Sequence, residues 1–198
     1  MQDRTTEQEL RERLNLIESM IAEGRRHTES WGWTFVLWGV IYYLAMAWSE
    51  WNQSPWAWPV TVLVGVIVTV AVSFIKVHPP TRLGRAIGSI WIALGITMTL
   101  LFPALALSGR LTDQHVFLAA ISAILGMANG ASALILRWKV QSVCAAVWWV
   151  AAVASCFGTE VQSTRVFLVA IFLCQIGFGV YGMIAEAQER KRRVPAHA

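Results

Sequence analysis

Charged residues are scarce in this 198-residue sequence. Asp, Glu, Lys and Arg make up 14% of it, whereas an ordinary soluble domain carries about 25%. None of them falls near the middle of a long apolar segment, and the acidic residues beyond position 30 lie close to segment ends. These acidic residues are Glu50, Asp113, Glu160, Glu186 and Glu189. With 56% hydrophobic residues, this pattern excludes an ordinary soluble fold and indicates an integral membrane protein.

Groups that carry enzyme chemistry are equally few. The cysteines, Cys144, Cys156 and Cys174, lie inside apolar segments and form no CxxC pair or Cys/His cluster, so we expect buried thiols without zinc or disulfides. His78 and His115 are predicted on opposite sides of the membrane and cannot share a haem. An intramembrane carboxylate, which proton-coupled exporters generally use, is missing as well. We therefore expect no catalytic residues, no metal, no cofactor and no enzyme activity.

The formal net charge of +4 does not indicate nucleic-acid binding. The basic residues lie in short turns and in the two tails, and membrane topology accounts for that placement. The first thirty residues are too polar for a signal peptide, so we expect no cleavage there. Membrane lipid is the expected partner of the apolar surface, and nucleic acid is not expected as a partner.

Six apolar segments between residues 31 and 187 are each long enough to cross about 30 Å of hydrocarbon. Several of the eleven tryptophans cluster at segment ends, where indole rings favour the headgroup level. Pro79 and Pro80 forbid a continuous helix between the second and third segments, and Pro103 lies near the end of the third. The sequence predicts an all-α bundle of six transmembrane helices at 31–48, 58–77, 84–107, 114–136, 138–156 and 164–187.

The placement of positive charge orients these spans. If both termini are cytoplasmic, fourteen of the sixteen Lys and Arg residues fall on the cytoplasmic side, and only Arg110 and Arg165 fall outside. No other arrangement with an even number of spans approaches this split. We therefore predict a multi-pass membrane protein with both termini in the cytoplasm.

Residues 1–29 form the one segment with the composition of a soluble helix. Thr6 and Glu9 fit a capping box, and Gly24 is expected to end or loosen the helix. An apolar stripe follows spacings of four, three and four residues, and its members are Leu10, Leu14, Ile17 and Ile21. The predicted organisation is a cytoplasmic amphipathic helix at 1–29, a transmembrane domain at 30–188 and a basic cytoplasmic tail at 189–198.

The apolar stripe needs a surface to cover it, because isolated helices of this length are marginal in water. Residues 3–23 carry six acids and three arginines, which disfavours an anionic membrane surface. A second copy of the helix and a cytoplasmic protein are the remaining candidates, although two heptads make a weak coiled coil alone. We predict that residues 6–23 bind one of these two partners.

Two amides, Asn129 and Gln175, are the strongly polar groups expected deep in the membrane. A buried amide is costly in hydrocarbon unless it is hydrogen-bonded. Structural hydrogen bonds between helices are the simpler interpretation, and a ligand site between the fourth and sixth spans is the alternative.

Tryptophans and glycines inside the spans also have two interpretations each. An aromatic cage for a quaternary amine could be built from tryptophans, although packing or lipid contact explains them as well; the four are Trp38, Trp91, Trp148 and Trp149. Small residues four positions apart predict close helix packing or a dimer seam. The two such pairs are Gly84 with Gly88 and Gly126 with Gly130.

These features together resemble an uncharacterised family of small six-helix bacterial integral membrane proteins with an acidic amphipathic N-terminal helix. The resemblance covers nearly the whole chain. It depends on residues 18–25 (ESMIAEGR), 35–40 (FVLWGV), 90–95 (IWIALG) and 136–139 (LRWK). The chain departs from the family pattern at two prolines. The family has a proline in the sixth span, where this chain has Gly177, Gly179 and Gly182. The family also has a proline in the turn after Lys139, which this chain lacks. The resemblance implies the six-helix fold and a location in the bacterial inner membrane, and no particular chemistry.

We expect from these observations a non-enzymatic membrane protein that acts as a sensor, scaffold or assembly subunit through its cytoplasmic helix. The alternative is a small-molecule or lipid transporter that uses the bundle interior around Asn129, Gln175 and the tryptophans. A continuous cavity reaching Gln175 would favour transport, and a close-packed bundle would favour the assembly role.

Overall fold

The regular secondary structure of the described residues consists of helices without strands, which confirms the predicted all-α class. The computed structural model describes residues 2–52, 54, 56–75, 82–109 and 113–193. Its elements are α1 (Gln2–Glu29), α2 (Gly32–Asn52), α3 (Ala57–Ile75), α4 (Arg82–Leu107), α5 (Gln114–Leu136), α6 (Lys139–Phe157), α7 (Glu160–Ile171), the π-helical turn η1 (Phe172–Gly177) and α8 (Phe178–Arg193). Because α7, η1 and α8 follow one another without a break, they form one continuous helix.

Five of these helices are long and apolar enough to cross a membrane, as expected of a multi-pass membrane protein. They are α3, α4, α5, α6 and the continuous helix α7–η1–α8. The predicted first span, α2, is not among them, so the number of six spans is not confirmed. Its 21 residues would extend about 31 Å, but four tryptophans and two tyrosines lower its mean hydropathy.

Most predicted boundaries lie within a few residues of the observed ones. The predicted fourth span coincides with α5, while the last helix begins at Glu160 rather than at 164. A capping box fixes that start. The backbone N–H of Gln162 donates to Thr159 Oγ1, and the backbone N–H of Thr159 donates to Gln162 Oε1. Helix α4 continues past Pro103 to Leu107. The predicted break at Pro79 and Pro80 lies outside the described residues.

Two predictions about the N-terminal helix were wrong. Helix α1 begins at Gln2, so Thr6 lies inside it and does not cap it. No Gly or Pro occurs in residues 2–5 to stop the helix. The helix also continues through Gly24 to Glu29. Gly24 is buried, and a Cβ there would lie 2.7 Å from a Leu83 methyl and 2.8 Å from a Leu136 methyl, so the glycine permits close packing instead of ending the helix.

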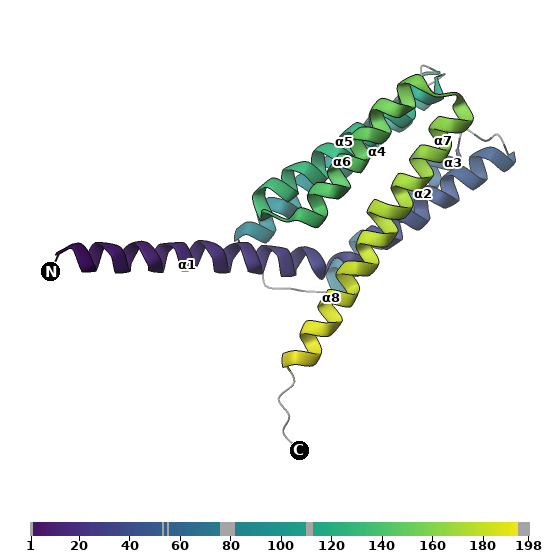
Figure 1. Ribbon diagram of the computed structural model, residues 1–198. Coiled ribbons are helices and arrows are strands. Elements are labelled where there is room, and N and C mark those ends of the chain that lie inside the picture. Colours follow the sequence, from purple (N-terminus) through teal and green to yellow (C-terminus); the bar gives the residue numbers. More distant parts are fainter. Residues whose placement is uncertain (1, 53, 55, 76–81, 110–112, 194–198) are drawn as a thin grey trace.

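The helices form an elongated bundle from which α1 departs sideways (Figure 1). Helices α5 and α6 make a long antiparallel hairpin with the most extensive contact in the molecule. On the other side, α2 packs against α3 and α8, while α7 packs against α6. Only the C-terminal end of α1 meets the bundle, and its N-terminal part extends beyond it (Figure 1).

A very short basic turn joins α5 to α6, as the sequence predicted. Arg137 adopts the left-handed conformation with φ of 47°. The amide of Trp138 donates to the Ala133 carbonyl at 3.0 Å and the amide of Arg137 donates to that of Leu134 at 3.4 Å. This is a Schellman ending, in which glycine is the usual residue at the left-handed position.

Candidate functional site

The apolar stripe of α1 is exposed in the isolated chain. Leu10, Leu14 and Ile17 are 58%, 52% and 54% exposed, and Ile21 is half-buried. Leu16, outside the predicted stripe, is exposed as well. The stripe therefore presents a row of large apolar side chains on a helix that projects from the bundle (Figure 1).

The base of α1 is fixed to the bundle by polar contacts. Arg25 Nε donates to the carbonyl oxygen of Leu136 at 2.9 Å, and the same guanidinium donates to the carbonyl of Arg137. Arg26 Nε forms an ion pair with Glu189 Oε1 at 3.1 Å. These contacts join α1 to the C-terminal end of α5 and to the end of α8.

Glu29 lies at the same base. Partial burial and the carboxylate of Glu189 raise the pKa of Glu29, while Arg26 and Arg25 oppose that rise. Ionised Glu29 is therefore less stable here than in water.

The two predicted amides are both buried but lie on different elements. Asn129 is on α5 and Gln175 is on η1, which packs against α2 and α6. Asn129 Nδ2 donates to the Leu125 carbonyl at 2.9 Å, one turn earlier in its own helix. Its Oδ1 has no hydrogen-bond partner among the described residues. The expected hydrogen bond between helices is therefore not formed by Asn129 in this part of the chain.

Other buried polar atoms without protein partners also lie on α5 and α6 within the described residues. They are Ser122 Oγ and Ser132 Oγ on α5, with both side-chain polar atoms of Gln141 and the Trp148 Nε1 on α6. Sequence reasoning singled out Trp148 but not Ser122, Ser132 or Gln141, because single Ser and Gln residues in apolar segments are common. These buried polar atoms give the interior of the α5–α6 hairpin a polar character that its apolar sequence does not indicate.

The predicted tryptophans do not converge into one cage. Trp91 packs edge-on against Phe35 with ring centroids 4.9 Å apart, whereas Trp148 is fully buried beside Phe167. Trp38 lies near Tyr42, at a centroid separation of 5.9 Å. These three rings pack in or against the hydrophobic core, so packing, the other interpretation of the tryptophans, accounts for them.

The glycine pair on α5 packs against a tryptophan of the next helix. A Cβ on Gly126 would lie 2.5 Å from Trp149 Cδ1, and one on Gly130 would lie 2.8 Å from Trp149 Cη2. Close packing within one chain therefore accounts for this pair. The other pair differs, because Gly84 is buried while Gly88 has nothing within 4 Å of its Cβ position.

A second glycine contact, not predicted, joins α2 to α8. A Cβ on Gly32 would lie 2.6 Å from the Gly179 carbonyl oxygen, and a Cβ on Gly179 would lie 2.6 Å from the Gly32 carbonyl oxygen. The two backbones therefore meet without room for a side chain. The closely spaced glycines Gly177, Gly179 and Gly182 could have indicated close packing in the last helix. Nothing in the sequence indicated that Gly32 would be the residue they pack against.

A cavity of about 360 Å³ opens at the end of the bundle remote from α1, between α2, α3, α4 and α5. We call it the outer cavity. Aromatic rings line it, including Tyr42, Trp58, Phe102 and Phe117, and Trp38 also borders it. Two carboxylates, Glu50 and Asp113, belong to its lining. Asn129, Gln175 and Trp148 do not line it, so it is not a path to the predicted polar interior.

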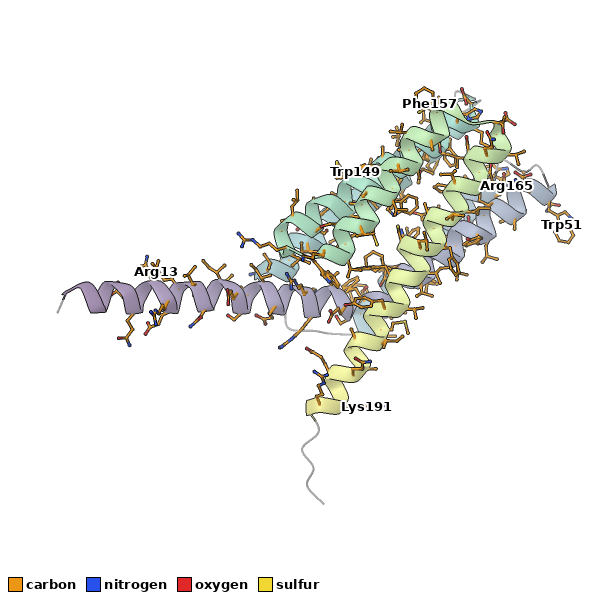
Figure 2. The ribbon with its side chains drawn as sticks, in the orientation of Figure 1. Arg13, Trp51, Trp149, Phe157, Arg165 and Lys191 are labelled. Carbon is orange, nitrogen blue, oxygen red and sulfur yellow. The ribbon has the colours of Figure 1, made fainter. Side chains whose placement is uncertain are left out.

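An open apolar groove of about 520 Å³ lies between α6 and α7. Its lining consists of valines and alanines with one charged residue, Arg165, which lies on the bundle's outer surface (Figure 2). Such a surface is expected where hydrocarbon chains of lipid contact the protein.

The ends of the bundle differ in their exposed side chains. Trp51 and Phe157 project at the end remote from α1 and are 88% and 86% exposed, whereas Lys191 lies towards the α1 side (Figure 2). Within the described residues, no group of three or more His, Cys, Asp or Glu side chains could hold a metal ion.

Comparison of the chain with protein-family models, with curated proteins and with solved structures finds no match. The resemblance to the uncharacterised six-helix family therefore stays a prediction.

Proposed function

We propose that the chain is a non-enzymatic membrane protein that acts as an assembly subunit, with α1 as its partner-binding element. The observation that carries this proposal is the exposed apolar stripe on a helix anchored at only one end. An apolar stripe of this size is costly in water and is stabilised by a covering surface.

We propose that the covering surface is α1 of a second copy. Two copies in one bilayer are related by an axis along the membrane normal, and α1 leaves the bundle sideways (Figure 1). Two α1 helices that meet across such an axis run antiparallel. This arrangement sets Leu14 opposite Ile17 of the other copy and brings Arg11 near the other copy's Glu18, so the charges are complementary.

The orientation belongs to the same proposal. With six spans, α2 included, both termini lie in the cytoplasm of a bacterial cell and α1 lies on that side. Fourteen of the sixteen Lys and Arg residues then fall inside. The exposed aromatic side chains at the remote end suit the outer headgroup level.

Transport through the interior receives less support. The outer cavity does not reach Gln175 or Asn129, and both amides lie buried among packed helices. The assembly role is therefore the function that the geometry favours.

The experiment compares two double variants of the full chain in native membranes. Leu14→Glu with Ile17→Glu places two charges in the stripe and is expected to abolish cross-linked dimer while leaving the protein inserted. Gln8→Glu with Asn15→Glu adds the same charge elsewhere on α1, at exposed positions, and should leave the dimer intact. If the stripe variant retains the dimer, or if the wild-type chain is monomeric in the membrane, the proposal is wrong.

A cysteine experiment tests the antiparallel arrangement separately. In a Cys156→Ser background, chains carrying Leu14→Cys and Ile17→Cys are co-expressed with different tags. Antiparallel pairing predicts a strong 14-to-17 disulfide between copies and a weaker 14-to-14 disulfide. A dominant 14-to-14 disulfide would show parallel helices instead.

A further inference from the structure

We infer that the outer cavity is a binding site for an organic cation with an apolar body, such as an aromatic or branched alkyl ammonium compound. Three properties of the cavity lead to this ligand class: its aromatic walls, the sign of charge in its lining, and its depth.

The aromatic walls are held by ring-to-ring packing. Phe117 lies edge-on to both Trp58 and Phe102, at centroid separations of 4.9 and 5.0 Å. Tyr42 lies 6.2 Å from Trp58 and 6.5 Å from Phe167, measured between centroids. Rings fixed in this way keep their positions when a ligand enters, which lowers the entropic cost of binding. Trp and Tyr rings also attract cations through their electron-rich faces.

Both charged residues of the described lining are acidic. Glu50 and Asp113 line the cavity, and none of its described lining residues is Lys, Arg or His. Asp113 is held in place as the N-cap of α5, because its Oδ1 accepts from the amide of His115 at 2.8 Å and from that of Val116 at 3.4 Å. Carboxylates beside a low-dielectric wall raise the local concentration of cations.

The cavity is deep enough for an apolar body below the charged group. Its lining on α2 extends from Trp38 to Glu50, which corresponds to about 18 Å along a helix. Its volume of about 360 Å³ lies within the range of roughly 300–1,000 Å³ for small-molecule pockets. The carboxylates lie near the ends of their helices, whereas Tyr42 lies about two turns further inside on α2 and Phe117 about one turn further inside on α5. An ammonium group near the mouth therefore leaves the rest of the ligand among these rings.

Benzyltrimethylammonium is a suitable probe because it combines a quaternary ammonium with an aromatic ring, and benzoate is its counterpart of opposite charge. Calorimetric titration of the purified full chain in nanodiscs should show saturable binding of the cation and none of benzoate. Glu50→Gln with Asp113→Asn should weaken cation binding about tenfold or more. Asparagine is as good an N-cap as aspartate, so the second change removes charge while keeping the start of α5.

The matched control is Glu160→Gln, which neutralises an exposed carboxylate at the same end of the bundle but outside the cavity. It should leave cation binding unchanged. Two variants test the contribution of the aromatic walls. Trp58→Phe should retain part of the affinity for the cation, whereas Trp58→Leu should lower that affinity about tenfold because leucine has no π face.

Three results would overturn the inference. They are no saturable binding of benzyltrimethylammonium to the wild-type chain, equal affinity for the cation and benzoate, and an unchanged cation affinity in the folded Glu50→Gln, Asp113→Asn variant. Thermal unfolding of each variant verifies that it is folded.

Discussion

Arg25 Nε, on α1, donates to the carbonyl oxygen of Leu136, the last residue of α5, at 2.9 Å although the two residues are 111 positions apart. The last carbonyls of a helix lack partners within it and carry the negative end of its dipole. The Arg25 guanidinium satisfies the last of them, on Leu136, together with the carbonyl of Arg137 in the turn that follows. The projecting helix therefore begins from a polar clamp on the end of the α5–α6 hairpin.

Removing this clamp should loosen α1 without unfolding the bundle. Arg25→Ala is expected to cost about 1–2 kcal/mol, because charged donors contribute more than neutral ones. Arg25→Lys should recover only part of that loss, since an ammonium cannot reproduce the planar fork. Hydrogen exchange is the measurement, and faster exchange is expected in residues 16–24 of the alanine variant. Unchanged exchange there would show that Gly24 packing alone holds the helix.

The contact between Gly126 and Trp149 predicts an asymmetry among glycine substitutions. Gly126→Ala forces a methyl to within 2.5 Å of the indole and should destabilise the folded chain by about 1–3 kcal/mol. Gly88→Ala meets nothing within 4 Å and should be neutral or slightly stabilising, because alanine is the better helix former. Thermal unfolding in detergent compares the two. Equal effects would mean that the indole moves aside without cost.

Glu29 predicts a dependence of stability on pH. Because burial and Glu189 raise its pKa in the folded state, the unfolded state holds the Glu29 proton less tightly than the folded state. The stability linked to Glu29 is therefore fully present below the ordinary carboxyl pKa of 4.5 and is lost as pH rises through the raised folded value. Glu29→Gln should make the chain more stable at neutral pH and flatten this part of the profile. Glu12→Gln, at an exposed position of α1 away from the stripe, is the charge-matched control.

Cysteine labelling in intact cells tests the membrane topology. In a Cys156→Ser background, Glu160→Cys should react with an impermeant maleimide from outside, while Glu18→Cys and Lys191→Cys should react only after permeabilisation. All three positions are exposed. If α2 did not cross the membrane, positions 18 and 191 would lie on opposite sides and one of them would react in intact cells. Ser163 is unsuitable for this purpose because it is 1% exposed and its hydroxyl donates to the Ser155 carbonyl.

Most helix positions were predictable because their signals are local. The apolar runs, and the basic turn at Arg137 and Lys139, follow from neighbouring residues, and α5 begins and ends where the sequence placed it. The status of α2 was less secure, since its tryptophans and tyrosines suit both a core and an interface. The start of α1 was misjudged because the Thr6 pattern fits a cap wherever it occurs.

The sites were less predictable because they depend on helices distant in sequence. Gly126 and Gly130 were recognised as packing residues, but nothing in their neighbourhood indicated Trp149 as the partner. Glu50 and Asp113 were predicted only as residues near segment ends, whereas the packing of four helices gathers them with Trp58 around one cavity. The same packing separates Trp91 and Trp148, which the sequence alone allowed to meet.

The π-helical turn at Phe172–Gly177 gives the last helix two different contact faces. One extra residue in a turn rotates everything beyond it by about 100° relative to an unbroken α-helix. Ahead of the turn, Phe167 and Ala170 are buried in the core on the side of α5 and α6, and beyond it Gly179 and Gly182 face α1 and α2. Deleting a single residue such as Leu173 would restore a regular helix but turn both glycines away from α2. The packing of this helix therefore depends on its exact number of residues as much as on its side chains. An insertion or deletion in it would be less tolerated than many substitutions.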